Sequence, residues 1–450
     1  MATPPASASG DDALRSRLLL LAPAWLILAV AALTPTAALL PDQGDVTLYF
    51  EKAQALSVGQ VPYRDFSFFY PPAALLPMVV PFLARFLGPI DLTDYKVLFG
   101  GVEAMLALVL GLLLVRIAER FALEDPHASG AGDGEATAGR IRSVGWRLAL
   151  LSVGAALALT WRYDLFPSVL VIAAVWAAIE RRPALAGAAL AVGVLAKLYP
   201  IAVLPSLAVP WLLPFDIRRL TRLGGAFALT IVVGFVPFLA LAGSAAFGFF
   251  DYQVGHGIQV ESVGGGIAVL GGLITGEPAG MSFANARVQV EGPIATLWLA
   301  IVPAITIAGF GTLGWLGWRR LRAEATAGAG GVRSATVVAL AGASVLMLLV
   351  TSKVYSIQYV VWLLPFLALL RGRQFWLGAS IVALTMPIHP LLYGGLVKQE
   401  AIPILVLNLR NGLVVALTAL LLRDLAGRGS AAEEMARPAG LEPTTFRSAT

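Results

Sequence analysis

The stretch that decides the fold class is VLFGGVEAMLALVLGLLLV, residues 97–115, in which Glu103 is the single charged residue. A helix needs about 20 mostly apolar residues to cross the hydrocarbon core of a bilayer, and this run meets that requirement. Comparable long runs lie at 18–40, 224–243, 293–318, 334–352 and 401–422. The sequence therefore predicts a polytopic membrane protein.

The composition of all 450 residues agrees with this prediction. Charged residues make up 13% of the chain and hydrophobic residues 58%, whereas soluble globular proteins carry about 25% charge. These values exclude an ordinary soluble enzyme, a disordered chain and a protein that binds nucleic acid through a basic stripe. Cysteine is absent and only three histidines occur, far apart in the sequence, so we expect no metal site built from these residues.

Several apolar segments are too short to be clear spans. Residues 147–214 form four short runs, divided by Arg162 and Asp164, then Arg181 and Arg182, then Lys197, Tyr199 and Pro200. A similar pair at 358–371 and 374–388 is divided by Arg371 and Arg373. Runs of this length can still cross where the bilayer thins locally. We expect an all-α protein with about 12 transmembrane helices.

The basic residues predict the orientation in the membrane. With the N-terminus in the cytoplasm, and with residues 71–88 entering the membrane without crossing it, 22 of the 32 Lys and Arg lie on the cytoplasmic side. This distribution obeys the positive-inside rule. If 71–88 crossed, every later loop would invert and the rule would fail. We therefore expect residues 71–88 to form a re-entrant or juxtamembrane segment.

This orientation divides the chain into three parts. They are a cytoplasmic lead at 1–17, a single multi-span domain at 18–422 and a flexible cytoplasmic tail at 423–450. The protein is expected in the cell membrane with both termini in the cytoplasm. Two long loops, 41–96 and 244–292, then lie on the outer side.

The first outer loop is the densest in polar and aromatic residues. Residues 44–72 read GDVTLYFEKAQALSVGQVPYRDFSFFYPP, and Asp45 directly follows the first span. Residues 46–58 predict a short amphipathic helix that ends at Gly59. Arg64 and Asp65 follow in the string PYRDF. A single loop acid is more often a solvated carboxylate or a helix cap than a catalytic group.

Three outer turns place a charge or an amide between apolar helices. They contain Arg162 and Asp164, Lys197, and the group Lys353, Gln358 and Tyr359. A lone lysine at a helix end is most often a snorkelling side chain, but three such turns beside an acidic loop could hold a lipid phosphate. In the second long loop, His256 and Glu261 belong to a polar string before a Gly-rich run, for which a mobile surface loop is the simpler interpretation.

Arg410 lies near the middle of the last apolar run, beside Asn408 and Asn411. An arginine at the bilayer centre needs a partner or a wet cavity, and Glu103 is a candidate partner. The alternative is that 389–411 is a loop, but the remaining residues 412–422 are too few to cross. A buried Arg410 is therefore the preferred interpretation.

Taken in order, these strings resemble the integral-membrane glycosyltransferases of the GT-C fold, and most closely the polyprenyl-phosphate-dependent family 87 of actinobacteria, which contains mannosyltransferases. The matching features are the acid after the first helix, the short helix, GxxPYRDF, YPP, KLYP at 197–200, HGIQVES at 256–262 and SxQYxxW at 356–362. The family more often has Arg where His256 stands and an acid where Phe69 stands. The resemblance covers most of residues 20–420.

The resemblance implies transfer of a sugar, with mannose favoured, from a polyprenyl-phosphate donor to a hydroxyl of a lipid or glycan acceptor on the outer face, with inversion. A positioned carboxylate must take the proton of that hydroxyl, and Asp45 is the matching position, with Asp65 as the alternative. The resemblance implies no particular cofactor, and the sequence contains no cluster of metal ligands. The chemistry is also compatible with a divalent metal.

The departing phosphate needs cations or amides around it. Residues implied for donor phosphate or sugar binding are Arg64, Lys197, Lys353, Gln358 and Tyr359, and further candidates are Arg162, Asp164, His256, Glu261 and Arg410.

Two other classes of function remain open at this stage. A transporter or flippase of a lipid-linked sugar or a polyanion would usually show repeated halves, and the sequence contains no such duplication. A non-catalytic assembly subunit would tolerate substitution of the loop carboxylates. Nucleic acid is not an expected partner.

Overall fold

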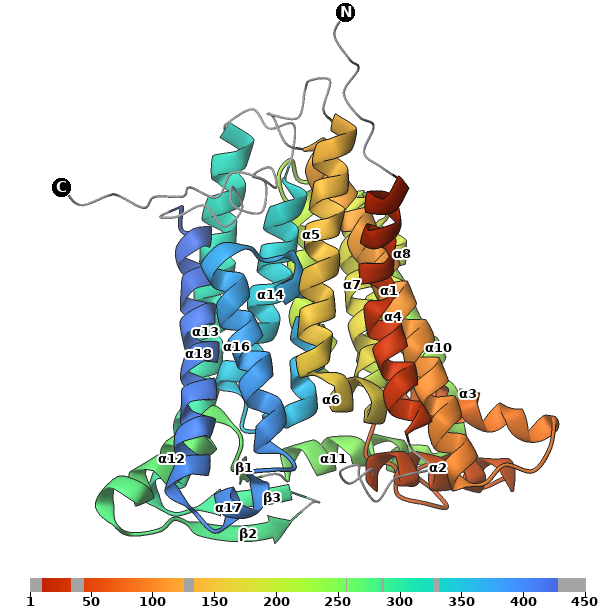
Figure 1. Cartoon of the computed structure of the whole chain (residues 1–450), viewed down its shortest axis with the longest axis vertical. Coiled ribbons are helices and arrows are strands. Elements are labelled where there is room, and N and C mark those ends of the chain that lie inside the picture. The colour runs from red at the N-terminus through yellow and green to blue at the C-terminus, as the bar shows by residue number, and fades with distance from the viewer. Residues whose placement is uncertain are drawn as a thin grey trace, which may run out of the picture.

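Long helices that run side by side form the body of the molecule (Figure 1). The computed structural model describes residues 10–33, 44–124, 133–255, 257–284, 287–326 and 332–427. Within these ranges five helices are long and apolar enough to cross a membrane, namely α4 (Leu92–Leu123), α10 (Ile217–Ala242), α13 (Pro293–Thr326), α14 (Ser334–Thr351) and α18 (Ala401–Leu425). The expected helical polytopic architecture is confirmed, and the count of about 12 spans stays a prediction.

Shorter helices begin and end where charged residues interrupt the apolar runs. The first predicted run is helical in α1 (Gly10–Ala32), and the part from residue 34 onward lies outside the described residues. The divided segments form α5 (Asp133–Gly154), α6 (Ala156–Trp161), α7 (Leu165–Ile179), α8 (Pro183–Ala196), η4 (Tyr199–Val203), α9 (Leu204–Ala208), η5 (Val209–Trp211), η7 (Ile357–Tyr359), α15 (Val360–Leu369) and α16 (Gly372–Ile388). The predicted helix breaks are therefore confirmed.

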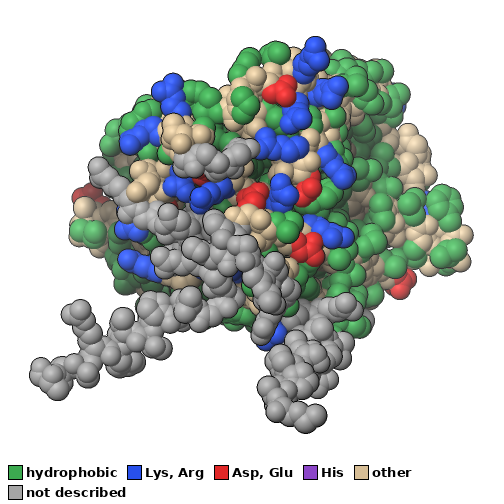
Figure 2. All heavy atoms as spheres, turned by 90° about the horizontal axis from the view of Figure 1, so that it is seen from above, with side chains coloured by type: hydrophobic (Ala, Val, Ile, Leu, Met, Phe, Trp, Pro, Cys, Tyr) green, Lys and Arg blue, Asp and Glu red, His purple; other side chains and the backbone are tan. Residues whose placement is uncertain are grey.

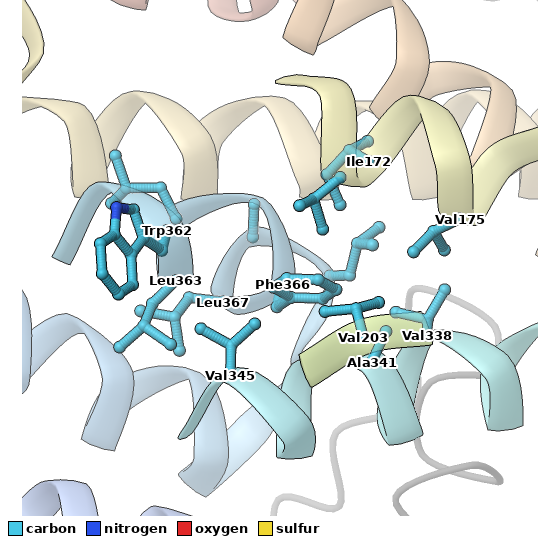
Figure 3. Close-up of a cluster of buried hydrophobic side chains, with 14 of the residues drawn as sticks. Ile172, Val175, Val203, Val338, Ala341, Val345, Trp362, Leu363, Phe366 and Leu367 are labelled. Carbon is cyan, nitrogen blue, oxygen red and sulfur yellow. The ribbon is translucent and has the colours of Figure 1, made fainter. Parts of the chain in front are cut away.

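The core of the bundle lies where α7, α14 and α15 meet. Every residue of α15 is buried, as expected for a helix that is hydrophobic on all sides. Figure 3 shows Phe366 of α15 among Ile172 of α7, Val203 of η4 and Ala341 of α14. By contrast, α10 contains an apolar window long enough to cross a membrane and yet buries only Leu223. An exposed apolar surface of this size marks a contact with a membrane or with another protein, and the length of the window fits a membrane.

The two ends of the bundle differ in charge. The start of α1 and the end of α18 lie at the same end (Figure 1), and Figure 2 shows that Lys and Arg side chains gather on this face. The opposite end, which we call the outer-loop end, carries α2 (Gly44–Ser57), α11 (Gly248–Val254), α12 (Val263–Thr275) and α17 (Tyr393–Val397). This distribution is the one that the positive-inside rule predicts for a chain with both termini in the cytoplasm.

The first outer loop folds largely as expected. The predicted short helix is α2, and the chain leaves it through Gly59 in a left-handed conformation with φ of 84°, which glycine adopts without strain. Residues 71–88 form η2 (Pro72–Ala74), α3 (Leu75–Phe82) and η3 (Leu83–Phe86), and α3 extends sideways from the bundle in Figure 1.

The second outer loop contains a small antiparallel sheet that the sequence did not predict. Its order is β1 (Ile258–Gln259), β3 (Arg287–Glu291), β2 (Gly280–Ala284), and Gln259 pairs with Gln289. Ile258, Val288 and Val290 are buried in a core of their own with side chains of α12 and α18. The expectation of a mobile surface loop is therefore wrong for this segment. Strands of two to five residues are too short to show a clear alternation.

Candidate active site

Lys197 and Asp164 form a buried ion pair at the outer-loop end. Lys197 directly follows α8, and Asp164 directly precedes α7. The Lys197 Nζ lies 2.6 Å from Oδ1 of Asp164, and the two side chains are 14% and 1% exposed. The same oxygen accepts a hydrogen bond of 2.6 Å from the indole Nε1 of Trp362. One carboxylate thus joins three segments of the chain, and α15 fixes Trp362 within the core (Figure 3).

Aromatic rings enclose the ammonium group of Lys197. Its Nζ lies 5.2 Å from the ring centroids of Tyr163 and Tyr359 and 5.4 Å from that of Trp362. Tyr199 and Tyr359 are both stacked on Trp362, with centroid distances of 3.9 and 3.8 Å. Burial lowers the pKa of Lys197, and the Asp164 carboxylate opposes this shift. The rings and the carboxylate together favour the charged lysine.

A second ion pair lies next to the first. Oδ2 of Asp45 is 2.9 Å from Nε of Arg162, and the side chains are 35% and 14% exposed. Arg162 is two residues before Asp164, so both pairs meet at the turn between α6 and α7. The Tyr163 ring packs edge-on against Tyr49 of α2 at 5.6 Å. This contact holds α2, and with it Asp45, against the turn.

Arg287, the first residue of β3, also lies in this region, although the sequence did not indicate it. Its guanidinium carbon lies 5.6 Å from the ring centroid of Tyr252, which is itself stacked on Phe69 at 4.4 Å. Burial is the largest influence on the pKa of Lys197, which it lowers, and on that of Glu261, which it raises, and in both cases the positive charge of Arg287 acts to lower the pKa. Among the described residues, its buried Nη1 atom has no hydrogen-bond partner. The only signal in the sequence was a lone arginine in an outer loop, in the string RVQVE.

Arg410 is fully buried on α18, as predicted, but its partner is not Glu103. Its Nη2 donates a 2.8 Å hydrogen bond to the backbone carbonyl of Glu261, and its guanidinium lies 3.9 Å from the ring centroid of Tyr355. The suggested pairing with Glu103 is wrong, because α4 and α18 lie on opposite sides of the bundle (Figure 1). Neither carboxylate oxygen of Glu103 has a hydrogen-bond partner in the described chain.

Glu261 is buried in the turn that follows β1. Its carboxylate accepts a hydrogen bond from Nε2 of Gln259. Burial raises the pKa of Glu261 to about 7, although Arg410, Gln259 and Arg287 all act in the opposite direction. This carboxyl group therefore titrates near neutral pH, unlike an ordinary surface acid.

Arg64 and Asp65 pair with each other on the surface. Their closest atoms, Nε and Oδ1, are 2.9 Å apart, and the Arg64 side chain is 52% exposed. Asp65 also accepts a 2.7 Å hydrogen bond from the Val61 backbone N–H, and these contacts lower its pKa to about 2. In the part of the chain that the structure describes, neither residue contacts Asp45 or Lys197. The roles predicted for them in the reaction gain no support from this geometry.

The other predicted residues have different surroundings. The carbonyl of Lys353 accepts a 2.9 Å hydrogen bond from the Gln259 backbone N–H, and burial lowers the pKa of the Lys353 side chain. Gln358 is half-buried and precedes Tyr359 in η7. His256 lies outside the described residues. No group of three or more His, Asp or Glu side chains within the described ranges could hold a metal ion.

The structure has a distant likeness to solved structures, whereas the sequence comparisons find no relative. No model of a protein family matches the sequence, and no curated protein matches it significantly. The structure is similar to that of ArnT from Cupriavidus metallidurans, determined with bound undecaprenyl phosphate. The TM-score is 0.43 at 15% sequence identity, over 89% of this chain and 77% of that one. A likeness of this degree assigns neither an activity nor a ligand to the present chain.

Proposed function

We propose that this chain is a membrane glycosyltransferase of the GT-C type that takes its sugar from a polyprenyl-phosphate donor. The observation that carries the proposal is the pair of adjacent ion pairs, Asp45 with Arg162 and Asp164 with Lys197, at the outer-loop end. An acid that can accept a proton and cations that can meet a phosphate come from three separate segments of the chain. The strings that resemble family 87 include two of these residues, Asp45 and Lys197.

Asp45 is the best candidate for the general base. Its contact with Arg162 uses Oδ2, and the side chain is 35% exposed, so an acceptor hydroxyl can reach the carboxylate. Asp164 is 1% exposed and is already bonded to Lys197 and Trp362. A base must lie within hydrogen-bond reach of the proton that it takes, and only Asp45 of these two is open to a substrate.

The cations are suited to the leaving group. In the proposed reaction the acceptor hydroxyl gives its proton to Asp45, and its oxygen forms a bond to the anomeric carbon. The bond from that carbon to the phosphate oxygen breaks, and its electron pair leaves with the polyprenyl phosphate. Arg162, Lys197 and Arg287 are then the groups that stabilise the negative charge developing on the phosphate. The indole and tyrosine rings around Lys197 offer a surface for the sugar.

The identities of the sugar and the acceptor, and the side of the membrane, are proposed from the sequence resemblance. Mannose is the proposed sugar, the acceptor is a lipid or a glycan, and the reaction takes place on the outer face of the cell membrane with both termini in the cytoplasm. Gln358 and Lys353 are proposed to contribute to donor binding from the turn beside Tyr359. The basic face at the opposite end of the bundle (Figure 2) is consistent with this orientation.

The test is sugar transfer by the purified protein in liposomes, with a panel of radiolabelled polyprenyl-phosphate sugars that includes mannose. Asp45→Asn and Asp45→Ala are expected to lower kcat roughly 100-fold or more, because a positioned base contributes about 10²–10⁴-fold. Asp65→Asn, a matched acid in the same loop, is expected to retain activity. Full activity of both Asp45 variants would contradict the assigned base. Movement of a lipid-linked sugar across the bilayer without a new glycosidic bond would favour the transporter.

A further inference from the structure

The irregular turn 352–356, which precedes η7, depends on another part of the chain for its hydrogen bonds. It connects α14 to η7, and Ser352 and Ser356 at its two ends are both extended, with ψ of 144° and 154°. Buried backbone groups without a helix or a sheet must find partners elsewhere. The turn carries Lys353 and leads directly into Tyr359, so its position sets that of two candidate donor-binding residues.

Gln259 of β1 supplies these partners. Its backbone N–H donates to the Lys353 carbonyl at 2.9 Å, and its Oε1 accepts from the Tyr355 N–H at 3.1 Å. The Ser356 hydroxyl lies 3.1 Å from Oε1 and 3.0 Å from Nε2, so it can both donate to and accept from the same amide. Gln259 as a whole residue is 4% exposed, which makes each of these bonds costly to lose.

The same glutamine also holds the second outer loop. Its Nε2 donates to the Glu261 carboxylate, and its carbonyl accepts the N–H and the hydroxyl of Ser262, at 3.0 and 2.8 Å. Its position in β1 pairs it with Gln289 of β3, the strand that begins at Arg287. One residue thus connects the two parts of the chain: its backbone pairs with the strand that bears Arg287, and its side chain bonds Tyr355 and Ser356 in the turn that bears Lys353.

We infer that Gln259 is a positioning residue for donor binding, which fixes the Lys353–Tyr359 turn and the Arg287 strand relative to each other around the donor phosphate. Gln259 need not touch the substrate, since it acts through the residues on either side of it. This inference rests on the proposed function. It predicts that a change at Gln259 weakens donor binding more than it slows the chemical step, because Asp45 is held by α2 and Arg162.

Exchanging the side chains of residues 259 and 261 tests the positioning role of Gln259. Gln259→Glu removes the N–H that Glu261 accepts and places two carboxyl groups together, and it is expected to raise the KM for the polyprenyl-phosphate sugar roughly 10-fold or more, with a smaller change in kcat. In the double variant Gln259→Glu/Glu261→Gln, residue 261 donates and residue 259 accepts, so the bond is restored. The double variant is expected to return KM to within about 3-fold of wild type.

Two further variants test whether the effect on KM comes from the bonds between Gln259 and the turn. Ser356→Ala removes only the hydroxyl that bridges the Gln259 amide, so a smaller rise in KM is expected even if Gln259→Glu fails to fold. Gln289→Ala removes a buried glutamine of the same sheet whose side chain bonds Gly257 and Ala284 rather than the turn, and its KM should stay near that of wild type. Unfolding temperatures in detergent identify variants that are merely unfolded.

The outcomes separate the two proposals. Wild-type protein that transfers sugar, together with an unchanged KM in folded Gln259→Glu, or a double variant that is folded but not rescued, would overturn the positioning role of Gln259. Wild-type protein that transfers no sugar from any polyprenyl phosphate would instead overturn the proposed function.

Discussion

Asp164 and Lys197 meet at 2.6 Å in a site from which water is largely excluded, although 33 residues separate them in the chain. A buried pair of this kind is strongly destabilised when one partner alone is removed, because the other is left as an unpaired buried charge. Replacing both partners together is far less harmful. The pair therefore gives a prediction in which two changes are better tolerated than one.

Lys197→Met and Asp164→Asn are each expected to lower the free energy of unfolding by roughly 3–5 kcal/mol. The double variant Asp164→Asn/Lys197→Met should recover most of this loss, while both variants that lack the lysine should lose sugar transfer. Denaturant unfolding in detergent and the transfer assay measure the two effects separately. The exposed pair Arg64 and Asp65 is the control, and its removal should change the unfolding midpoint little. If the double variant lost as much free energy of unfolding as the two single variants together, the charges of Asp164 and Lys197 would not be coupled.

Arg410 gives a second prediction, about a charge inside a candidate membrane helix. Its guanidinium carbon lies 3.9 Å from the ring centroid of Tyr355 while Nη2 donates to the Glu261 carbonyl, and the compact ammonium of a lysine does not reproduce this planar, forked group. Arg410→Lys is therefore expected to destabilise the protein by about 1–3 kcal/mol. Arg423→Lys is the matched control, because Arg423 lies on the same helix and is 56% exposed. Equal stability of the two variants would contradict the contacts of Arg410.

The sequence was a good guide to position along the bundle axis. Charged residues are costly within the bilayer, so Arg162, Arg181 and Arg371 mark helix ends, and the structure breaks its helices at or beside each of them. The same reasoning placed Asp45, Asp164 and Lys197 at one end of the bundle. Hydropathy along the chain indicates how deep in the membrane a residue lies, and these predictions concerned only that depth.

Lateral position could not be predicted in this way. Arg410 and Glu103 are both charges within apolar runs, yet Arg410 meets Glu261, which is 149 residues away. Trp362 and Asp164 are 198 residues apart, and only the packing of α15 against α7 brings them together. Arg287 could not be recognised because it lies in a sheet whose strands have five residues or fewer, which is too short for a clear alternation of apolar and polar residues in the sequence.

The carboxyl group of Glu261 makes stability dependent on pH. Its pKa is about 7 in the folded protein, above the ordinary value of 4.5. Between these two values the folded state holds a proton that the unfolded state has released, so stability falls as the pH rises from about 4.5 to about 7. Glu261→Gln should therefore raise the unfolding temperature relative to wild type at pH 8 and have a much smaller effect at pH 5.

Asp65→Asn is the control for this pH dependence. The pKa of Asp65 is lowered to about 2, so its carboxylate stays charged in the folded and unfolded states between pH 5 and pH 8. Its substitution should therefore have the same effect on the unfolding temperature at both ends of that range. A difference between wild type and Glu261→Gln that is the same at pH 5 and pH 8 would show that Glu261 does not titrate there.

The orientation in the membrane is the last prediction, and the absence of cysteine from the sequence makes it simple to test. Phe283 of β2 is 77% exposed at the outer-loop end, and Ala325 is exposed in the last turn of α13, at the basic end. In intact cells, a membrane-impermeant maleimide should label the Phe283→Cys variant and leave the Ala325→Cys variant unlabelled until the membrane is opened. The reverse pattern would place Asp45 and Lys197 in the cytoplasm. In that case the positive-inside argument would fail, and the donor would have to be used on the inner face.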